Sequence, residues 1–305
     1  MPGTKTGERA GGKMPETLKA EELRKAALAK VRAEEYDEAL ALYDEASLLA
    51  SDEETRELIT INKADAMIAM GRDGAEVHAL PTILMRRRNL HHAFMAAYAL
   101  MFKHRLQSDS KRGIFYGQLA LNIAIEANES SWKVGALNDL GIIYETDSQF
   151  DKAIDCLEQA LELVGTVADN DERTFVQNAI VQNLGYNKLL VGETEAGLFL
   201  LHSVIDKVQA PTTLADAYID LCYGYLDLED YERARYYGNI GLELAAEARQ
   251  VRNAHYLLGE AAYKSGDTEA AEHHFDELCK FYPQFRNLKS LLFAIDLRGM
   301  VNLKL

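Results

Sequence analysis

Small residues recur at a fixed interval along this chain. In the segment 136–163, Gly141 is followed twelve positions later by Ala153, and then by Leu157 and Ala160. The same offsets occur twice more, at Gly259, Ala271, Phe275 and Leu278 and at Ala27, Ala39, Tyr43 and Ala46. This spacing predicts pairs of antiparallel helices whose backbones approach at the small residues, while larger apolar side chains fill the adjoining gap.

Proline is too rare in this chain to interrupt many helices. Only five of the 305 residues are proline, and three of them, Pro2, Pro15 and Pro283, stand near the ends. Short polar turns at 147–149 and 265–267 separate the two halves of the clearest repeats. We therefore expect an all-α fold.

The repeat weakens in two places. At 184–204 and 221–241 the offsets persist, but Gly238 and Gly241 stand where other repeats have a larger or different residue. We expect looser packing there. Between 57 and 130 the helical period continues, although the sequence does not determine the register of the repeats.

The pattern resembles the tetratricopeptide repeat family, most clearly at 136–165 and 252–285. Successive small residues lie 44, 37 and 37 positions apart, from Gly141 through Gly185 and Cys222 to Gly259. These intervals exceed the familiar 34 and are similar to those of bacterial-type regulatory repeats. The resemblance implies a right-handed superhelical solenoid of about seven antiparallel helix pairs, followed by a C-terminal helix near 286–298.

Four segments follow from this interpretation. Residues 1–15 are polar and glycine-rich and predict a disordered tail. Residues 16–130 form N-terminal helical repeats, the first tetratricopeptide-like and the next two degenerate. Residues 131–285 form four tetratricopeptide-like repeats. Residues 286–305 form an apolar helix or extension, which either folds back on the last repeat or makes an interface between copies of the chain, giving a homo-oligomer.

The resemblance also implies a binding groove lined by the first helix of each pair. Its partner is a protein or peptide, and the affinity should depend on several side chains of the groove together. The alternative is that the groove tyrosines are half-buried packing residues. The positions that the family pattern selects are Asn138, Ile142, Gln182, Tyr186, Ile219, Tyr223, Asn253, Tyr256, Glu260 and Tyr263.

Motifs for catalysis or for cofactor binding are absent from the sequence. It contains no glycine-rich phosphate loop, no nucleophile elbow and no paired-cysteine metal motif. His273 and His274 are neighbours on one predicted helix, so they point about 100° apart and do not chelate together; we expect them at the surface. We predict no enzyme activity, no catalytic residues, no cofactor and no metal.

Charge argues against two classes of partner. The net charge of −15 disfavours nucleic acid and anionic membranes. One segment departs from this balance, because residues 86–112 hold seven lysines or arginines against a single aspartate. This cluster either binds an acidic partner segment, an anionic ligand or nucleic acid, or it is a solvated helix face that pairs with neighbouring acidic repeats within the fold. Its candidate members are Arg86, Arg87, Arg88, Lys103 and Arg105.

The remaining features point to the cytoplasm. The three cysteines, Cys156, Cys222 and Cys279, are scattered and odd in number, which favours a reducing compartment. No signal peptide is visible, and no apolar run approaches the length of a membrane span. We expect a non-catalytic scaffold or adaptor that binds a protein or peptide. The alternative is a regulatory sensor that takes up a small signalling peptide and changes conformation.

Overall fold

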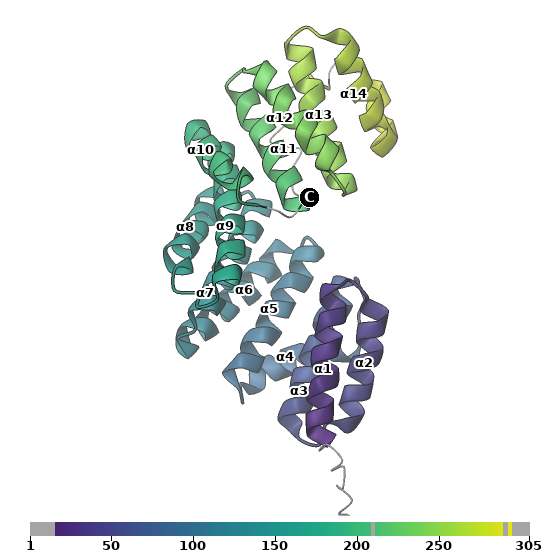
Figure 1. Cartoon of the computed structure of the whole chain (residues 1–305), viewed down its shortest axis with the longest axis vertical. Coiled ribbons are helices and arrows are strands. Elements are labelled where there is room, and N and C mark those ends of the chain that lie inside the picture. The colour runs from purple at the N-terminus through teal and green to yellow at the C-terminus, as the bar shows by residue number, and fades with distance from the viewer. Residues whose placement is uncertain (1–15, 209–210, 289–291, 295–305) are drawn as a thin grey trace, which may run out of the picture. The chain divides into compact units, whose positions relative to one another are not determined.

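Helices and their connections make up the part of the chain that the structure describes. This computed structural model describes residues 16–208, 211–288 and 292–294, so the predicted tail at 1–15 lies outside it. Contacts divide the chain into two compact units, Met1–Gln107 and Ser108–Leu305, here called unit 1 and unit 2. Figure 1 shows each of them as a set of packed helices. Within the described ranges no strand occurs, and the all-α prediction is confirmed.

Unit 1 holds the N-terminal helices. Helix α1 packs on α2, α3 packs on α4, and α5 packs on both α3 and α4. The core between α1, α2 and α3 is built from Ala20, Ala27, Tyr43 and Ile59, among others. Its helices are α1 (Glu16–Arg32), α2 (Tyr36–Leu49), α3 (Glu53–Ala69), α4 (Ala75–Arg86) and α5 (Leu90–Leu106).

Unit 2 begins with α6, and four helix pairs follow it. Helix α7 packs on α8, α9 on α10, α11 on α12 and α13 on α14. Its elements are α6 (Ser110–Ala127), α7 (Ser130–Thr146), α8 (Phe150–Val164), α9 (Asn170–Leu190), α10 (Thr194–Ile205), α11 (Pro211–Asp227), α12 (Tyr231–Leu244), α13 (Ala248–Lys264), α14 (Thr268–Phe281) and the 3-10 turn η1 (Pro283–Leu288).

The turn within the helix pairs has one repeated construction. In five pairs the second residue before the second helix has a left-handed backbone, with φ between 56° and 82°. In the turn after α7 the N–H of Ser148 donates to the carbonyl oxygen of Glu145 at 2.9 Å, which closes the end of the helix. The residues are Glu34, Ser148, Gly192, Glu229 and Gly266. The last four lie 44, 37 and 37 positions apart, which is the period of the small residues.

The close helix approach predicted at Gly141 is confirmed. A Cβ atom built on Gly141 would lie 2.8 Å from Cγ of Leu157 and 3.4 Å from the carbonyl oxygen of Ala153. Leu157 and Ala153 themselves are fully buried. The side chain of Leu157 therefore fills the space that the missing Cβ leaves between α7 and α8.

The looser packing expected at Gly238 and Gly241 is wrong. A Cβ on Gly238 would lie 2.7 Å from a methyl carbon of Leu258 on the next first helix, α13. A Cβ on Gly241 would lie 2.9 Å from Ile219 on α11 and within 3.3 Å of backbone atoms. The glycines stand at these positions because α12 is packed closely against neighbours on two sides.

The substitution Gly141→Leu is expected to lower the free energy of unfolding by about 1–3 kcal/mol, because the added side chain overpacks the contact with Leu157. Gly165→Leu is the matched control, since Gly165 has a helical backbone with φ −60° and a Cβ there would meet nothing within 4 Å. Chemical denaturation measures both. Equal effects of the two substitutions would contradict the proposed packing.

The C-terminal segment differs from its prediction. Residues 283–288 form a 3-10 turn rather than part of an α-helix, and residues 292–294 form a further turn. Leu292 and Phe293 are 1% and 5% exposed and belong to the core of unit 2. Of the two alternatives for the apolar C-terminus, this described pair takes the fold-back onto the last repeat. Residues 289–291 and 295–305 lie outside the described part.

Candidate functional site: the first-helix face of unit 2

The first helices of successive pairs contact one another directly in unit 2. Helix α7 contacts α9, α9 contacts α11, and α11 contacts α13. We call the surface that they form together the first-helix face. Its side chains come from residues 37 to 45 positions apart in the sequence, because each pair contributes one first helix to the row.

Amide side chains connect the first two helices of this face. Nδ2 of Asn183 on α9 donates to Oδ1 of Asn138 on α7 at 3.2 Å. One turn further along, Nδ2 of Asn187 donates to Oε2 of Glu145 at 2.7 Å and to the carbonyl oxygen of Asn183 at 2.9 Å. Asn187 and Glu145 are buried, whereas Asn138 and Asn183 are half-buried. A buried carboxylate is stabilised by such a donor. The hydrogen bond from Asn187 to Glu145 therefore helps to hold α9 against α7.

Tyrosines continue the row toward the C-terminus. The rings of Tyr186 on α9 and Tyr223 on α11 meet edge to face, with centroids 6.2 Å apart and an interplanar angle of 74°. The ring of Tyr256 on α13 lies 6.1 Å from that of Phe293. Tyr186 and Tyr256 are each 1% exposed, so these rings form part of the core.

The structure places the ten predicted groove residues on one row of helices but leaves few of them open to solvent. Tyr263 is 48% exposed, and Asn138 and Ile142 are half-buried. The direct contact between neighbouring first helices is the physical reason, because side chains that point along the row are covered by the next helix. The other seven, Gln182, Tyr186, Ile219, Tyr223, Asn253, Tyr256 and Glu260, are buried.

An open pocket lies on the same side of α9 as the predicted residues. At about 100° per residue, Phe175, Ala179, Gln182 and Tyr186 fall within one narrow stripe of the helix. The ring of Phe175 is 68% exposed. This α9 pocket has a volume of about 380 Å³ and is lined by Asp171, Thr174, Phe175, Asn178, Ala179, Lys207, Val208 and Thr213.

The α9 pocket was not predicted from the sequence, although a signal for it exists. Asn178 and Ala179 lie one turn before Gln182, and Phe175 one turn earlier still. Extending the predicted stripe toward the start of α9 would have reached all three. Asn183 and Asn187 were missed for a different reason, since each lies one position after a predicted groove residue, Gln182 or Tyr186. Glu145 lies four positions after Gly141, as Tyr263 does after Gly259, but that offset was used only in the last repeat.

The predicted basic cluster is divided between the two ends of α5. Nη1 of Arg88 lies 2.5 Å from Oε1 of Glu53, and Nη1 of Arg86 lies 3.7 Å from the same atom. Arg87 is the left-handed residue that ends α4. At the far end, Nζ of Lys103 lies 3.3 Å from Oδ1 of Asp73. Helix α5 has 17 residues, so the two groups are separated by about 25 Å along its axis.

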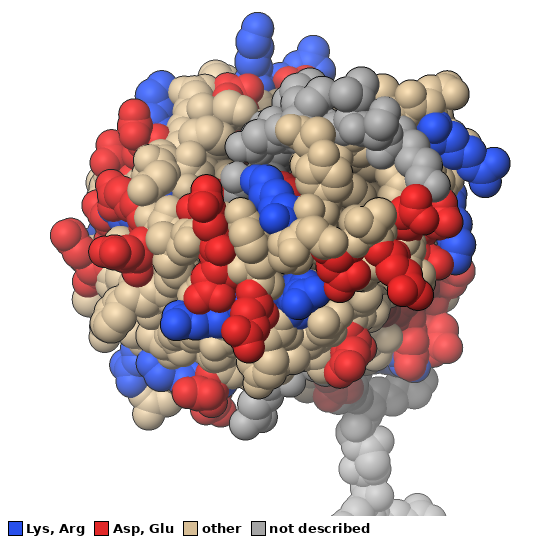
Figure 2. Space-filling model, turned by 90° about the horizontal axis from the view of Figure 1, so that it is seen from above, with Lys and Arg blue, Asp and Glu red and all other residues tan. Residues whose placement is uncertain are grey.

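Arg86, Arg88 and Lys103 therefore each form an ion pair with an acidic residue of unit 1. The guanidinium of Arg105 lies 4.8 Å above the ring of Phe102. The face shown in Figure 2 is a different one, seen from above the view of Figure 1, and on it basic and acidic side chains are interspersed among uncharged ones. This face does not form the continuous basic surface that nucleic acid needs.

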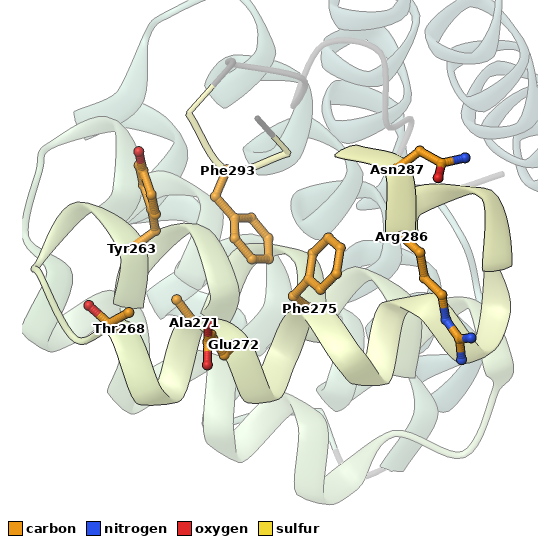
Figure 3. Close-up of a pocket in the computed structure, with 8 residues that line it drawn as sticks. All are labelled: Tyr263, Thr268, Ala271, Glu272, Phe275, Arg286, Asn287 and Phe293. Carbon is orange, nitrogen blue, oxygen red and sulfur yellow. The ribbon is translucent and has the colours of Figure 1, made fainter. Parts of the chain in front are cut away.

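A second cavity, of about 530 Å³, lies at the C-terminal end of unit 2. Figure 3 shows the rings of Phe275 and Phe293 turned toward each other at its centre, with Arg286 and Asn287 on one side and Tyr263 on the other. The ring centroids of Phe275 and Phe293 are 6.4 Å apart. Thr268, Ala271 and Glu272 complete the wall.

The described residues show neither a cluster of metal ligands nor a helix suited to a membrane. Within residues 16–208, 211–288 and 292–294, no three or more His, Cys, Asp or Glu side chains are arranged to hold a metal ion. Over the same ranges, none of the helices combines the length and apolar character that crossing a membrane requires.

Family comparison identifies two of the repeats. Sequence profiles described as tetratricopeptide repeat match residues 136–171 and residues 253–285. These are the two segments in which the resemblance is clearest. Among curated protein sequences, none matches this chain.

Several solved structures share the fold at low sequence identity. The apo form of the quorum sensor NprR from B. thuringiensis is similar with a TM-score of 0.69 and 16% identity, over 92% of this chain and 82% of that chain. The apo form of RapI has a TM-score of 0.68 and 11% identity, over 92% and 84%. NprR in complex with its cognate peptide NprX has a TM-score of 0.66 and 16% identity, over 92% and 84%.

Proposed function

Because this chain is a tetratricopeptide repeat protein, we propose that unit 2 is a non-catalytic binding module that holds an extended peptide or protein segment on its first-helix face. The observation that carries the proposal is the α9 pocket. The exposed ring of Phe175 and the side chain of Asn178 line this cavity beside the row of first helices. A concave surface of stacked repeats is the part of such a fold that is available to a partner.

The chemistry of the row suits a peptide backbone. An asparagine side chain both donates and accepts, so it can pair with the N–H and the C=O of an extended chain. Neighbouring helix axes lie about 8–10 Å apart, and an extended chain advances about 3.3 Å per residue. One peptide group in about every three residues would therefore meet a first helix. Asn178 and Asn138 are half-buried and so reach the surface of this row.

The apolar part of the pocket would supply an anchor. Phe175 and Ala179 offer an uncharged wall, while Asp171 and Lys207 stand at the same pocket with opposite charges. A large apolar side chain of the partner, inserted beside Phe175, would be desolvated by this wall and contribute much of the affinity. Alternating apolar and polar groups in the partner would match this arrangement.

A regulatory sensor is the second candidate. It is favoured by the structural similarity to NprR, which has been solved both in the apo form and with its cognate peptide. In that case the bound segment would be a small signalling peptide, and binding would shift the population between two conformations of the repeats.

We expect peptides selected from a random displayed library on the full chain to lose at least about tenfold in affinity on Phe175→Ala, which corresponds to about 1.4 kcal/mol. Fluorescence anisotropy with a labelled selected peptide gives the affinities. Phe199→Ala is the matched control, because Phe199 is 75% exposed on the second helix α10. Its affinity should change by less than about twofold.

Two outcomes would contradict the proposal. The library would yield no specific binder, or the selected peptides would lose as much affinity on Phe199→Ala as on Phe175→Ala. The helical circular dichroism spectrum of each variant should match that of the wild type, since both phenylalanines are exposed.

A further inference from the structure

The last helix pair of unit 2 is filled differently from two of the pairs before it. In those pairs a leucine on the second helix stands sixteen positions after the glycine of the first helix. Cγ of Leu157 would lie 2.8 Å from a Cβ on Gly141. Leu201 repeats this contact with Gly185 at 2.9 Å. The leucine therefore fills the space at the glycine from within the pair.

Phenylalanine stands in place of this leucine in the last pair. Phe275 on α14 follows Gly259 on α13 by the same sixteen positions. The three atoms nearest to a Cβ on Gly259 are ring carbons of Phe293, at 2.2 to 2.9 Å, so the space at this glycine is filled from outside the pair. The rings of Phe275 and Phe293 meet edge to face at an interplanar angle of 83°.

The cavity of about 530 Å³ at the end of unit 2 lies beside these two rings. Helices α13 and α14 and the turn η1 contribute its other walls. Phe275 and Phe293 are 3% and 5% exposed, so the core holds their rings in place and this part of the wall is preformed. A preformed wall lowers the entropic cost of binding. The volume is within the range of about 300–1,000 Å³ that is usual for small-molecule sites.

The charged groups of this cavity lie on opposite sides of the two rings. Figure 3 shows Arg286 and Asn287 on one side and Glu272 on the other. Within residues 16–208, 211–288 and 292–294, the side chains of Arg286 and Asn287 have no hydrogen bond and no ion pair. Glu272, in contrast, already interacts with another residue. The charge that the cavity offers to a ligand is therefore positive.

A flat apolar group that ends in an anion matches this lining. The guanidinium of Arg286 and the amide of Asn287 are hydrogen-bond donors, and together they suit the two oxygens of a carboxylate. Aromatic rings of a ligand gain favourable contacts with the rings of Phe275 and Phe293. Tyr263 lines the cavity and is 48% exposed, so its ring is available as well.

We propose that this cavity binds an aromatic carboxylate. The ring of the ligand packs against Phe275, Phe293 and Tyr263, and its carboxylate accepts hydrogen bonds from the side chains of Arg286 and Asn287. A free aromatic acid and an aromatic residue at the end of a polypeptide share this chemistry. The cavity uses none of the residues of the α9 pocket, so the proposal goes beyond the proposed function and does not depend on it.

Isothermal titration calorimetry of the full chain with 2-naphthylacetate tests the proposal. Arg286→Gln is expected to weaken binding by at least about tenfold, because a charged donor to the carboxylate is lost. Arg72→Gln is the matched control, since it removes the same charge from a side chain of unit 1 that is 52% exposed. Its affinity should change by less than about twofold, because solvent and salt screen a distant surface charge.

Filling the cavity provides an independent variant. Thr268 is exposed at the first position of α14 and lines the cavity, so Thr268→Trp should occupy it and abolish detectable binding without loss of the helical spectrum. Thr194→Trp is the matched control, because Thr194 is the first residue of α10 and stands nine positions after Gly185, as Thr268 does after Gly259. Its affinity for 2-naphthylacetate should equal that of the wild type.

Matched compounds test the charge and the source of the ligand. The neutral 2-naphthylacetamide and the cationic 2-(2-naphthyl)ethylamine should each bind at least about tenfold more weakly than the acid. The tripeptide glycyl-glycyl-phenylalanine and its C-terminal amide represent a chain end. Tighter binding of the tripeptide than of 2-naphthylacetate, lost in the amide, supports the site with a chain end as its ligand, and the reverse order supports it with a free acid.

Four results would overturn the proposal. Neither the wild-type chain with 2-naphthylacetate nor that chain with the tripeptide would give a binding isotherm at millimolar concentration, Arg286→Gln would behave like Arg72→Gln, the amine would bind more tightly than the acid, or Thr268→Trp would bind as the wild type does. Phe175→Ala should leave the affinity for 2-naphthylacetate unchanged. Failure of the proposed function is separate, because it would appear as the absence of library-selected peptides.

Discussion

Replacing Tyr186 by alanine is expected to destabilise unit 2 by about 3–5 kcal/mol, the usual cost of removing a large aromatic side chain from a core. Tyr186 is 1% exposed and packs edge to face with Tyr223. At about 2–4 °C per kcal/mol for a domain of 150–250 residues, the melting temperature should fall by roughly 10 °C. Thermal unfolding followed by far-ultraviolet circular dichroism measures the change.

Tyr263→Ala is the matched control for this prediction. Tyr263 was selected from the sequence by the same row, but its side chain is 48% exposed near the end of α13. Its removal should change the free energy of unfolding by less than about 0.5 kcal/mol. If the two variants had the same melting temperature, Tyr186 would not be a core residue. A loss of partner binding in Tyr186→Ala would then report on binding rather than on folding.

Acidification is expected to destabilise unit 2 through a pair of histidines between α13 and α14. Nδ1 of His255 lies 2.9 Å from Nδ1 of His274. At neutral pH one nitrogen donates and the other accepts, whereas two imidazolium rings would both donate and would repel each other. Burial, together with His255 and His273, lowers the pKa of His274 to about 4. Burial also lowers the pKa of His255.

The direction of the pH effect follows from these lowered pKa values. Between pH 6.5, the ordinary value, and about 4, the unfolded chain binds a proton at His274 that the folded chain excludes. Stability is therefore present above pH 6.5 and is lost as the pH falls. At about 1.4 kcal/mol per pKa unit, the loss at His274 amounts to about 3 kcal/mol. The charges around the pair are Asp267, Glu277 and Lys280.

Urea denaturation at neutral pH and near pH 4.5 would measure the loss, and His274→Gln would isolate it. The variant keeps a polar side chain but has no imidazole, so its stability should depend less on pH by about 2–3 kcal/mol. His273→Gln is the control, because His273 is exposed on the same helix. An identical pH dependence of the wild type and His274→Gln would contradict the prediction. The sequence-based expectation that both histidines lie at the surface is wrong for His274, which is half-buried.

The repeated helix pair was readable from local spacing. Gly141 and Ala153 lie twelve positions apart, and the short turn between their helices brings them together. The structure confirms this contact. The left-handed residues Ser148 and Gly266 close the same turn in two repeats. Such contacts involve residues close together in the chain, so the pattern of residue sizes is sufficient to predict them.

Local spacing in the sequence could not predict whether the groove residues are exposed to solvent. Tyr186, Tyr256 and Glu260 stand at the positions that the family pattern selects, yet they are buried. Whether a side chain on a first helix meets water depends on how closely the next first helix approaches, about 40 residues further along the chain. The same holds for the amide contact between Asn138 and Asn183.

The prediction of a single basic cluster from the sequence met the same limit. Arg86, Arg88 and Lys103 are near one another in the sequence and formed one predicted cluster, but the length of α5 separates them, and Glu53 and Asp73 pair with them. Residue type and spacing determine the helices, the turns and the points of closest approach. The stacking of helices from distant parts of the chain decides which polar and aromatic side chains become core and which, such as Phe175, remain open to a partner, because burial depends on neighbours that local periodicity does not specify.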